Sequence, residues 1–213
     1  MIIKGVGTDF RWIGLVEVLW KAVSGIINFG ILSSIQFHDD LHGFCVGIGT
    51  GAATLKAKMF QQFIAMRKTV LRSIFLDLRK SYHALDRDRC LDILTGYGVG
   101  TSTLRILQIY WVELQMAEKV GGHYGSIFQI HRGVTQGDPL LPTIFNVVVD
   151  TVIRYWVTVL GGAREVAGQV LGSSIHPLLE LFYANDRLVA SPESARLQGA
   201  FDALVGLFDQ VGL

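Results

Sequence analysis

The longest apolar stretches of the chain are interrupted by polar residues, and this feature most constrains its fold. Residues 144–160 contain Asn146, Asp150 and Arg154, and residues 166–188 are broken by Ser, His, Pro and Glu. A membrane-spanning helix needs about 20 consecutive apolar residues, which neither stretch provides. Half of all residues are hydrophobic and 17% are charged. We therefore expect a soluble chain with a large core, or a piece of a larger core whose apolar surface has lost its partner.

The N-terminus and the cysteines bear on the compartment. Residues 1–5 have none of the architecture of a signal peptide. Cys45 and Cys90 belong to no CxxC or Cys/His cluster, so we expect neither disulfides nor structural zinc. The expected location is intracellular, in a reducing compartment and without a membrane-spanning segment.

Helical and strand patterns alternate irregularly along the chain. Because there is no strict βαβ repetition, the pattern indicates the α+β class. Residues 11–28 are expected to form a strand or turn followed by an apolar helix, and further helices are expected over 52–69, 83–97, 101–118, 142–160 and 197–211. Strands are expected over 70–78, as a buried strand, over 125–131, and as a strand–turn–strand unit over 178–190 with its turn at Ala184-Asn185-Asp186.

Positive charge is concentrated in residues 56–89, although the net charge is only +1. Such a strip is typical of a surface that faces phosphates. A solvated helix face would give the same pattern, and the charges alone do not separate these readings. The basic residues are Lys56, Lys58, Arg67, Lys68, Arg72, Arg79, Lys80, Arg87 and Arg89.

The first of three notable segments is FLDLRKSYH, residues 75–83. It places Asp77 at the end of an expected buried strand, where a carboxylate is costly to desolvate unless a cation or donor waits there. Asp77 could equally cap the following helix.

The second segment, RGVTQGDPLLP at residues 132–142, forms a rigid loop that leads into Phe145-Asn146. Such a loop can lay the Gln136 side chain and bare backbone against a flat base or sugar. Alternatively, it is a turn and a helix cap, with Pro142 in the first helical turn.

The third segment, LFYANDRLV at residues 181–189, holds the polar pair Asn185-Asp186 between two apolar strands. Taken alone, this pair is ordinary turn chemistry.

Together and in this order, the three segments resemble the palm motifs of reverse transcriptases of the non-LTR retrotransposon and group II intron type. That family reads F-x-D-x-x-x-A-Y/F-D, then R-G-x-x-Q-G-D-P-L-S-P-x-L-F-N, then Y/F-A-D-D. Upstream, Lys4 and residues 10–15 (FRWIGL) resemble the K…Y-R-P-I-x-L motif of the fingers, and residues 42–50 (HGFCVGIGT) resemble H-G-F-R-x-G-R-G-T. The resemblance covers nearly the whole chain.

The resemblance implies the fingers and palm of a right-hand polymerase. Residues 1–70 would be fingers-like and residues 71–213 palm-like, with an antiparallel palm sheet packed on helices. In the family, a Gly-Leu like Gly212-Leu213 is followed by a Lys-Thr pair and the thumb, so we expect this chain to lack both.

The resemblance also implies a metal site. Two divalent ions, Mg²⁺ with Mn²⁺ as an alternative, would be held by Asp77, Asp186 and the backbone carbonyl of Leu78. One ion would activate the primer 3′-hydroxyl, and the other would neutralise the incoming triphosphate and its leaving pyrophosphate.

Further matches imply how substrates are held. Tyr82 matches the aromatic residue under the deoxyribose, and Arg11 and Lys4 match the finger cations that grip the triphosphate. Gln136 and Gly137 match the residues that pack against nucleotide and template. The implied partners are an RNA template, a DNA primer and deoxynucleoside triphosphates.

The main departure from the family is Asn185, which stands where the first hairpin aspartate, a metal ligand, is expected. Loss of that charge should cost several kcal/mol of transition-state stabilisation, on the order of thousands-fold in rate. Other departures are His83 for Asp, Leu141 for Ser, Trp12 for Pro, and Cys45 and Ile48 for basic residues.

The sequence therefore predicts a reverse transcriptase domain, made for RNA-templated DNA synthesis by two-metal nucleotidyl transfer but inactive in this chain. Asn185 and the missing thumb are the reasons. Two alternatives stay open: an active polymerase, and a non-catalytic nucleic-acid-binding or assembly module derived from a mobile element.

Overall fold

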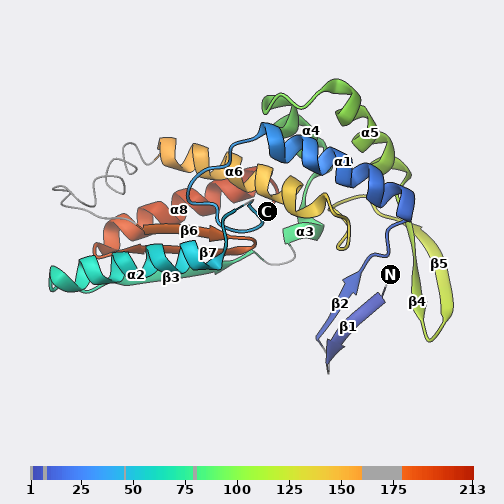
Figure 1. Cartoon of the computed structure of the whole chain (residues 1–213). Helices are drawn as coiled ribbons and strands as arrows, with labels where there is room; N and C mark the ends of the chain where they lie inside the picture. Colours follow the sequence, from blue (N-terminus) through green and yellow to red (C-terminus); the bar gives the residue numbers. More distant parts are fainter. Residues whose placement is uncertain (1, 7–8, 46, 79–80, 160–178) are drawn as a thin grey trace. The chain divides into compact units, whose positions relative to one another are not determined.

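The chain has an α+β fold with three antiparallel sheets, seen here in a computed structural model (Figure 1). The structure describes residues 2–6, 9–45, 47–78, 81–159 and 179–213. Two compact units interleave along the sequence. Unit 1 comprises Met1–Gln36 and Lys80–Phe145, and unit 2 comprises Phe37–Arg79 and Asn146–Leu213.

Unit 1 consists of helices and two β-hairpins. In one hairpin, β1 (Ile2–Val6) pairs with β2 (Asp9–Ile13), and in the other β4 (Gln115–Val120) pairs with β5 (His123–Gln129). The helices are α1 (Val18–Ser34), α3 (Ser81–Ala84), α4 (Arg87–Gly96), α5 (Thr101–Glu113) and the first turns of α6 (Leu141–Val159).

Local sequence signals set the helix ends of unit 1 and the packing between its helices. The Asp86 side chain accepts hydrogen bonds from the amides of Asp88 and Arg89 and so caps α4. On α1, the Trp20 ring stacks on Tyr110 of α5, with ring centroids 3.5 Å apart and planes 8° from parallel. This stacking contact fixes α1 against α5.

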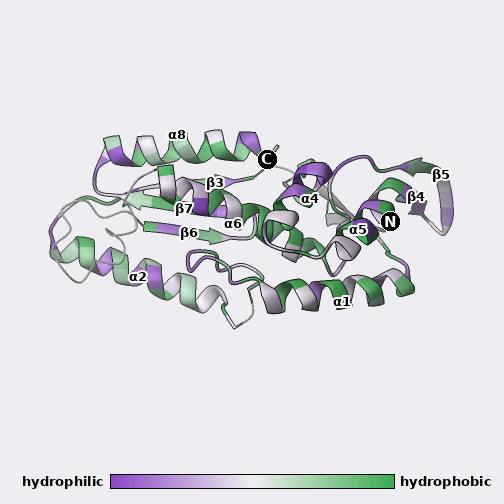
Figure 2. Cartoon of the chain, turned by 90° about the horizontal axis from the view of Figure 1, so that it is seen from above, coloured by the Kyte–Doolittle hydropathy of each residue, from purple (hydrophilic) through white to green (hydrophobic). Residues whose placement is uncertain are grey.

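Unit 2 is a three-stranded sheet between helices (Figures 1 and 2). The order is β3 (Arg72–Asp77), β7 (Asp186–Ser191), β6 (Leu179–Tyr183). On one face, α2 (Thr50–Met66) packs Phe60 and Ile64 against Leu179, Leu181 and Ala190. On the other, α8 (Ser194–Gln210) contacts β7 and β3. The buried residues of α8 recur at spacings of three and four: Leu197, Ala200, Leu204 and Phe208.

The expected fold class and most expected elements are confirmed, with differences at their ends. The helix expected over 101–118 ends at Glu113, and the residues after it form β4. Gly121 and Gly122, with φ of 58° and 85°, turn the chain so that β4 pairs with β5, and this hairpin pairing overrides helical propensity. The helix expected over 83–97 is two helices, α3 and α4. Strand β1 was not expected. Residues 160–178 lie outside the described part.

The prediction that residues 70–78 form a buried strand was wrong. β3 is an edge strand of the sheet, and its Phe75 side chain is 79% exposed. The reason is that α2 covers β6 and the adjoining part of β7, and leaves the outer strand uncovered on that face. Asp77 is therefore exposed, and no large desolvation cost attaches to its carboxylate.

Within the described ranges, no helix has both the length and the apolarity needed to cross a membrane.

The division at residue 70 between fingers-like and palm-like segments is a functional one. It does not coincide with the two compact units and stays a prediction.

Candidate active site

Two carboxylates face each other at the end of β3 in unit 2. In the antiparallel pairing of β3 with β7, Asp77 is the direct partner of Asp186. Directly opposed residues place their Cβ atoms about 5 Å apart on the same face of a sheet, and like charges there repel. The arrangement is unfavourable by itself and favours a cation between the two groups.

Asn185 completes this site. Its side-chain Nδ2 donates a hydrogen bond to Asp77 Oδ1 at 2.6 Å, and its main-chain carbonyl oxygen accepts from the Leu78 amide at 3.1 Å. Two carboxylates, an amide and the nearby Leu78 carbonyl are hard oxygen donors, which suit Mg²⁺ or Mn²⁺. Among the residues that the structure describes, however, no cluster of three His, Cys, Asp or Glu side chains could hold a metal ion. Asn185 is neutral, so only two carboxylates, those of Asp77 and Asp186, meet at this point.

The turn that carries Asn185 is held in an uncommon conformation. β6 and β7 are joined by the two residues Ala184 and Asn185, and Ala184 has a φ of 53°. Two-residue hairpin turns of the primed types need positive φ at this position, and a residue with a Cβ adopts it at a cost.

Arg187 holds this turn from within and was missed by the sequence analysis. Its side chain is buried, and Nη1 donates to the carbonyl oxygens of Ala184 and Asp186. The guanidinium lies 5.3 Å from the ring centroids of both Phe182 and Phe208. The sequence did hold one signal: Arg187 lies two residues before Val189 in β7, so both side chains point to the same, buried face of the strand.

In unit 1, the glycine of the FRWIGL segment contacts the Gln136 loop. The Gly14 amide donates to Gln136 O at 2.6 Å. A Cβ on Gly14 would lie 3.1 Å from that oxygen and would overlap the Thr135 side chain. Only glycine permits so close an approach.

The same loop packs on the helix that contains Tyr82. The Val134 amide donates to Tyr82 O at 2.9 Å, and Gly133, with a φ of 74°, leaves no room for a Cβ against His83. The Tyr82 ring lies 4.8 Å from that of Phe145, at 59°. This tilted contact fixes the orientation of the Tyr82 ring.

Asp138 anchors the other end of the loop. Its Oδ1 accepts from the Leu140 amide at 2.9 Å, and its Oδ2 accepts from Trp20 Nε1 at 2.6 Å. Pro142 does lie in the first turn of α6, as expected. The Asp138 side chain accepts from Leu140, which precedes α6, so it holds the turn and does not cap the helix. Gln136 remains half-exposed, so the turn and the binding interpretation are compatible.

A pocket of about 460 Å³ lies beside the Gln136 loop in unit 1. A volume of this size is in the range of small-molecule sites. Gly137, with a φ of 110°, is exposed next to Gln136. The lining includes Gly14, Met116, Phe128, His131, Thr135 and Gln136.

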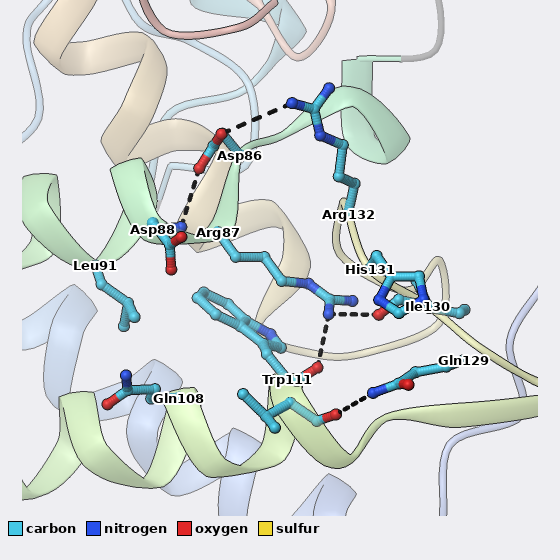
Figure 3. A pocket seen from close by; sticks show the side chains of 11 residues that line it. Asp86, Arg87, Asp88, Leu91, Gln108, Trp111, Gln129, Ile130, His131 and Arg132 are labelled. Atoms are coloured by element: carbon cyan, nitrogen blue, oxygen red, sulfur yellow. Dashed lines mark hydrogen bonds and ion pairs between the residues drawn. The ribbon is translucent and has the colours of Figure 1, made fainter.

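A second pocket of unit 1, of about 470 Å³, surrounds Arg87 (Figure 3). The Arg87 guanidinium donates to the carbonyl oxygens of Gly133, Trp111 and Ile130 at 2.6–2.9 Å. Arg87 therefore ties the end of β5 to the end of α5, and burial lowers its pKa. This member of the basic strip has a structural role.

Other members of the basic strip divide between contacts and solvent. Lys56 pairs with Asp40, and Arg72 donates to Pro192 O at 2.6 Å. The strip is distributed over both units, and Arg79 and Lys80 lie outside the described residues. Exposed members are Lys58, Arg67, Lys68, Arg72 and Arg89.

The predicted site residues thus form one group in each unit. In unit 2 the structure brings Asp77, Leu78, Asn185 and Asp186 together, and in unit 1 it brings Tyr82, Gln136 and Gly137 onto one loop-and-helix surface. Lys4 and Arg11 are register partners across the β1–β2 hairpin of unit 1.

Comparisons with solved structures identify the class of fold. The chain superposes on telomerase from Candida tropicalis, in complex with the TWJ fragment of telomeric RNA, with a TM-score of 0.62, 13% identity, and coverage of 91% of this chain and 31% of that chain. The Candida albicans telomerase gives a TM-score of 0.62 at 12% identity, covering 90% and 33%. These similarities show a polymerase-type fold.

Sequence comparison gives the family. The model for reverse transcriptase (RNA-dependent DNA polymerase) matches residues 3–213, and the chain belongs to this family. It is 24% identical over 208 residues to the retrovirus-related Pol polyprotein from type-2 retrotransposable element R2DM of Drosophila melanogaster, which covers 96% of this chain and 18% of the polyprotein. It is 21% identical over 207 residues to the Pol polyprotein from type-1 retrotransposable element R2 of Popillia japonica, covering 97% and 28%. The chain is a reverse transcriptase domain of the non-LTR retrotransposon type and spans less than a third of either polyprotein.

Proposed function

We propose that this domain is built for RNA-templated DNA synthesis and that Asn185 leaves its metal site nearly inactive. The observation that carries the proposal is the hydrogen bond from Asn185 Nδ2 to Asp77 Oδ1. An amide proton there occupies an oxygen atom that a divalent cation would need. Family membership supports the reaction, and the substitution supports its loss.

The residues that would hold the ions are Asp77, Asp186 and the carbonyl of Leu78, with Mg²⁺ or Mn²⁺ as the metal. When bound, two such ions would supply charge neutralisation at the primer 3′-hydroxyl and at the triphosphate. Asp77 and Asp186 oppose each other in register, which suits this task.

Asn185 weakens the site in two ways. It removes one negative charge, and Mg²⁺ strongly prefers anionic oxygen. It also gives Asp77 a neutral partner without any metal, so binding must first break a short hydrogen bond. We expect the combined loss to be on the order of thousands-fold in rate.

Unit 1 would supply the template and nucleotide contacts. Gln136 and Gly137 would pack against template and nucleotide, Tyr82 would lie under the deoxyribose, and Lys4 and Arg11 would grip the triphosphate. The exposed Gly137, the pocket beside Gln136 and the fixed Tyr82 ring support these roles. The partners would be an RNA template, a DNA primer and deoxynucleoside triphosphates, with residues 1–70 acting as fingers and 71–213 as palm.

The second candidate function is a non-catalytic nucleic-acid-binding or assembly module. It is favoured because the Asn185–Asp77 hydrogen bond satisfies the site without metal. Exposed cations on and just after α2, such as Lys58 and Lys68, would contribute a salt-sensitive affinity for RNA. Filter binding of a labelled RNA at low and moderate salt tests this, and no binding at low salt would exclude it.

Primer extension on an RNA template tests the main proposal. The unmodified chain, Asn185→Asp, and Asn185→Asp combined with Asp77→Asn should be compared in Mg²⁺ and in Mn²⁺. We expect Asn185→Asp to extend the primer at least about a hundredfold faster than the unmodified chain, and the double variant to lose this gain. Equal and robust extension by the unmodified chain would refute the inactivity. If neither the unmodified chain nor Asn185→Asp extends the primer, their relative affinities for Mn²⁺ decide whether Asn185 weakens the metal site.

A further inference from the structure

The hairpin turn is braced from outside by a segment of unit 2 to which no role has been assigned. This Gly43 segment, residues 38–43, runs beside β6. Leu41 forms a parallel bridge with Phe182, the Phe182 amide donates to Asp40 O at 3.0 Å, and the His42 amide donates to Phe182 O at 2.8 Å. The segment therefore reaches the turn as an additional short strand.

At its end, Gly43 lies directly against the turn backbone. A Cβ on Gly43 would lie 3.1 Å from Tyr183 C and 3.2 Å from Ala184 Cα, and closer still to Ala184 N. All three are main-chain atoms, which cannot swing aside as a flexible side chain would. Gly43 is thus required by space, in contact with the one turn residue that has a positive φ.

Asn146 holds Gly43 in place. Its Nδ2 donates to Gly43 O at 2.7 Å, and the residue is fully buried on α6. Its Oδ1 has no hydrogen-bond partner among the described residues. Its Nδ2 also donates a weak hydrogen bond to Cys45 Sγ at 3.7 Å. Burying an amide whose oxygen is unpaired is costly, on the order of 1–3 kcal/mol, so packing alone does not explain an asparagine here.

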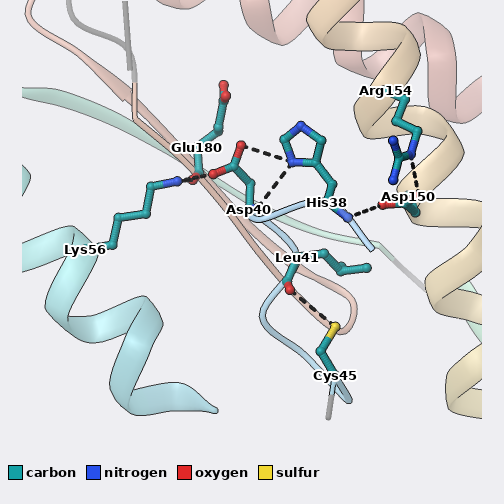
Figure 4. Close-up of polar contacts among 8 residues, drawn as sticks. All are labelled: His38, Asp40, Leu41, Cys45, Lys56, Asp150, Arg154 and Glu180. Carbon is teal, nitrogen blue, oxygen red and sulfur yellow. Dashed lines mark hydrogen bonds and ion pairs between the residues drawn. The ribbon is translucent and has the colours of Figure 1, made fainter. Parts of the chain in front are cut away.

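The beginning of the segment is tied down at two points (Figure 4). The Asp40 carboxylate accepts from Lys56 on α2, and Lys56 Nζ also donates to Glu180 O at 3.1 Å. The His38 amide donates to Asp150 Oδ1 on α6 at 2.6 Å. The segment is therefore fixed to α2, to β6 and to α6. These contacts hold Gly43 in place against the backbone of the turn.

We propose that Gly43 and Asn146 are positioning residues of the hairpin, which keep Asn185 and Asp186 opposite Asp77. Neither touches the site atoms. Each acts through Ala184, whose strained conformation persists only if its surroundings impose it. The catalytic meaning of this clamp rests on the proposed function, because it is the metal-binding geometry that the clamp would preserve.

Hydrogen exchange tests the clamp without metal or activity. In Gly43→Ala, we expect amides in peptides covering 72–78 and 179–191 to exchange at least about tenfold faster, while α8 is unchanged. Gly49→Ala is the matched control, since a Cβ there meets nothing within 4 Å. Unchanged exchange at the hairpin in Gly43→Ala would overturn the proposal.

A second variant covers the case in which Gly43→Ala does not fold. Asn146→Ala adds no bulk and removes the donor to Gly43 O, together with a weak hydrogen bond to Cys45 Sγ, so the hairpin should again exchange faster than α8. No local change would contradict the clamp.

Mn²⁺ affinity in the Asn185→Asp background separates positioning from stability. In that background, Gly43→Ala should weaken Mn²⁺ binding at least about fivefold. Leu197→Ala, a core change in the first turn of α8, should lower stability without weakening Mn²⁺ binding. Equal losses in both variants would overturn the positioning role. If Asn185→Asp gains no metal affinity, the proposed function fails, while the exchange result still judges the clamp.

Discussion

Asn185 and Asp77 share a hydrogen bond of 2.6 Å from amide nitrogen to carboxylate oxygen, at the point where Asp77 also faces Asp186 across the sheet. The amide offsets a repulsion between carboxylates that a cation would otherwise offset. If the proposed function holds, Asn185 has opposite effects: it would stabilise the hairpin without metal and weaken the site for metal.

Stability in the absence of metal should show this trade. Asn185→Asp brings three carboxylates together, so in EDTA we expect a loss of about 1 kcal/mol in the free energy of unfolding. Mn²⁺ should reverse this loss in Asn185→Asp and leave the free energy of unfolding of the unmodified chain little changed. Denaturant unfolding with and without Mn²⁺ measures both. A variant as stable as the unmodified chain in EDTA would show that the carboxylates do not interact.

Arg187 should be the most sensitive residue of the hairpin. In Arg187→Met, the side chain can no longer donate to Ala184 O or Asp186 O, and we expect a loss of about 2–4 kcal/mol. Arg72→Met on the exposed edge strand is the control, with an expected change within about 0.5 kcal/mol. Similar losses in urea unfolding of the two variants would contradict a special role for Arg187.

The Trp20–Asp138 hydrogen bond should couple α1 to the Gln136 loop. Trp20→Phe keeps a ring to stack on Tyr110 but removes the donor to Asp138 Oδ2. A double-mutant cycle with Asp138→Asn should give a coupling free energy of about 1–2 kcal/mol. Additive losses would mean that the two residues act independently.

His42 should make the stability of unit 2 fall in mild acid. Burial, assisted by the nearby Lys56 charge, lowers the pKa of His42 below its ordinary value of 6.5. Between that lowered pKa and 6.5, the unfolded chain binds more protons than the folded one, so the stability that is present above pH 6.5 is lost as the pH falls. His42→Phe cannot titrate and should show a shallower decline between pH 7.5 and 5.5 in thermal unfolding. Parallel curves would assign the acid sensitivity to other groups.

How far the sequence predicts this molecule differs between local and long-range features. The α+β class, the helix after the Gln136 loop and the hairpin with Asn185 at its turn follow from periodicity and turn residues close together in the chain. Motif order then singled out Asp77 and Asp186, which the structure places in register.

Features that depend on distant partners were not predictable from one sequence. Whether β3 is central or at the edge depends on which strands pair with it, so an apolar pattern was taken for burial. The contacts of Gly14 with Gln136 and of Gly43 with Ala184 join segments more than a hundred residues apart. Arg187 was missed because an arginine beside a turn is usually solvated, whereas here two phenylalanine rings enclose it.

The most direct test of the account is the Mn²⁺ affinity of the unmodified chain and of Asn185→Asp, measured by electron paramagnetic resonance of free Mn²⁺. Asn185→Asp combined with Asp77→Asn is the control, because it restores the original number of carboxylates. We predict an affinity at least about tenfold higher for Asn185→Asp than for the unmodified chain, and a return toward the original value in the double variant. Equal affinity of the unmodified chain and Asn185→Asp would contradict the claim that Asn185 disables the metal site.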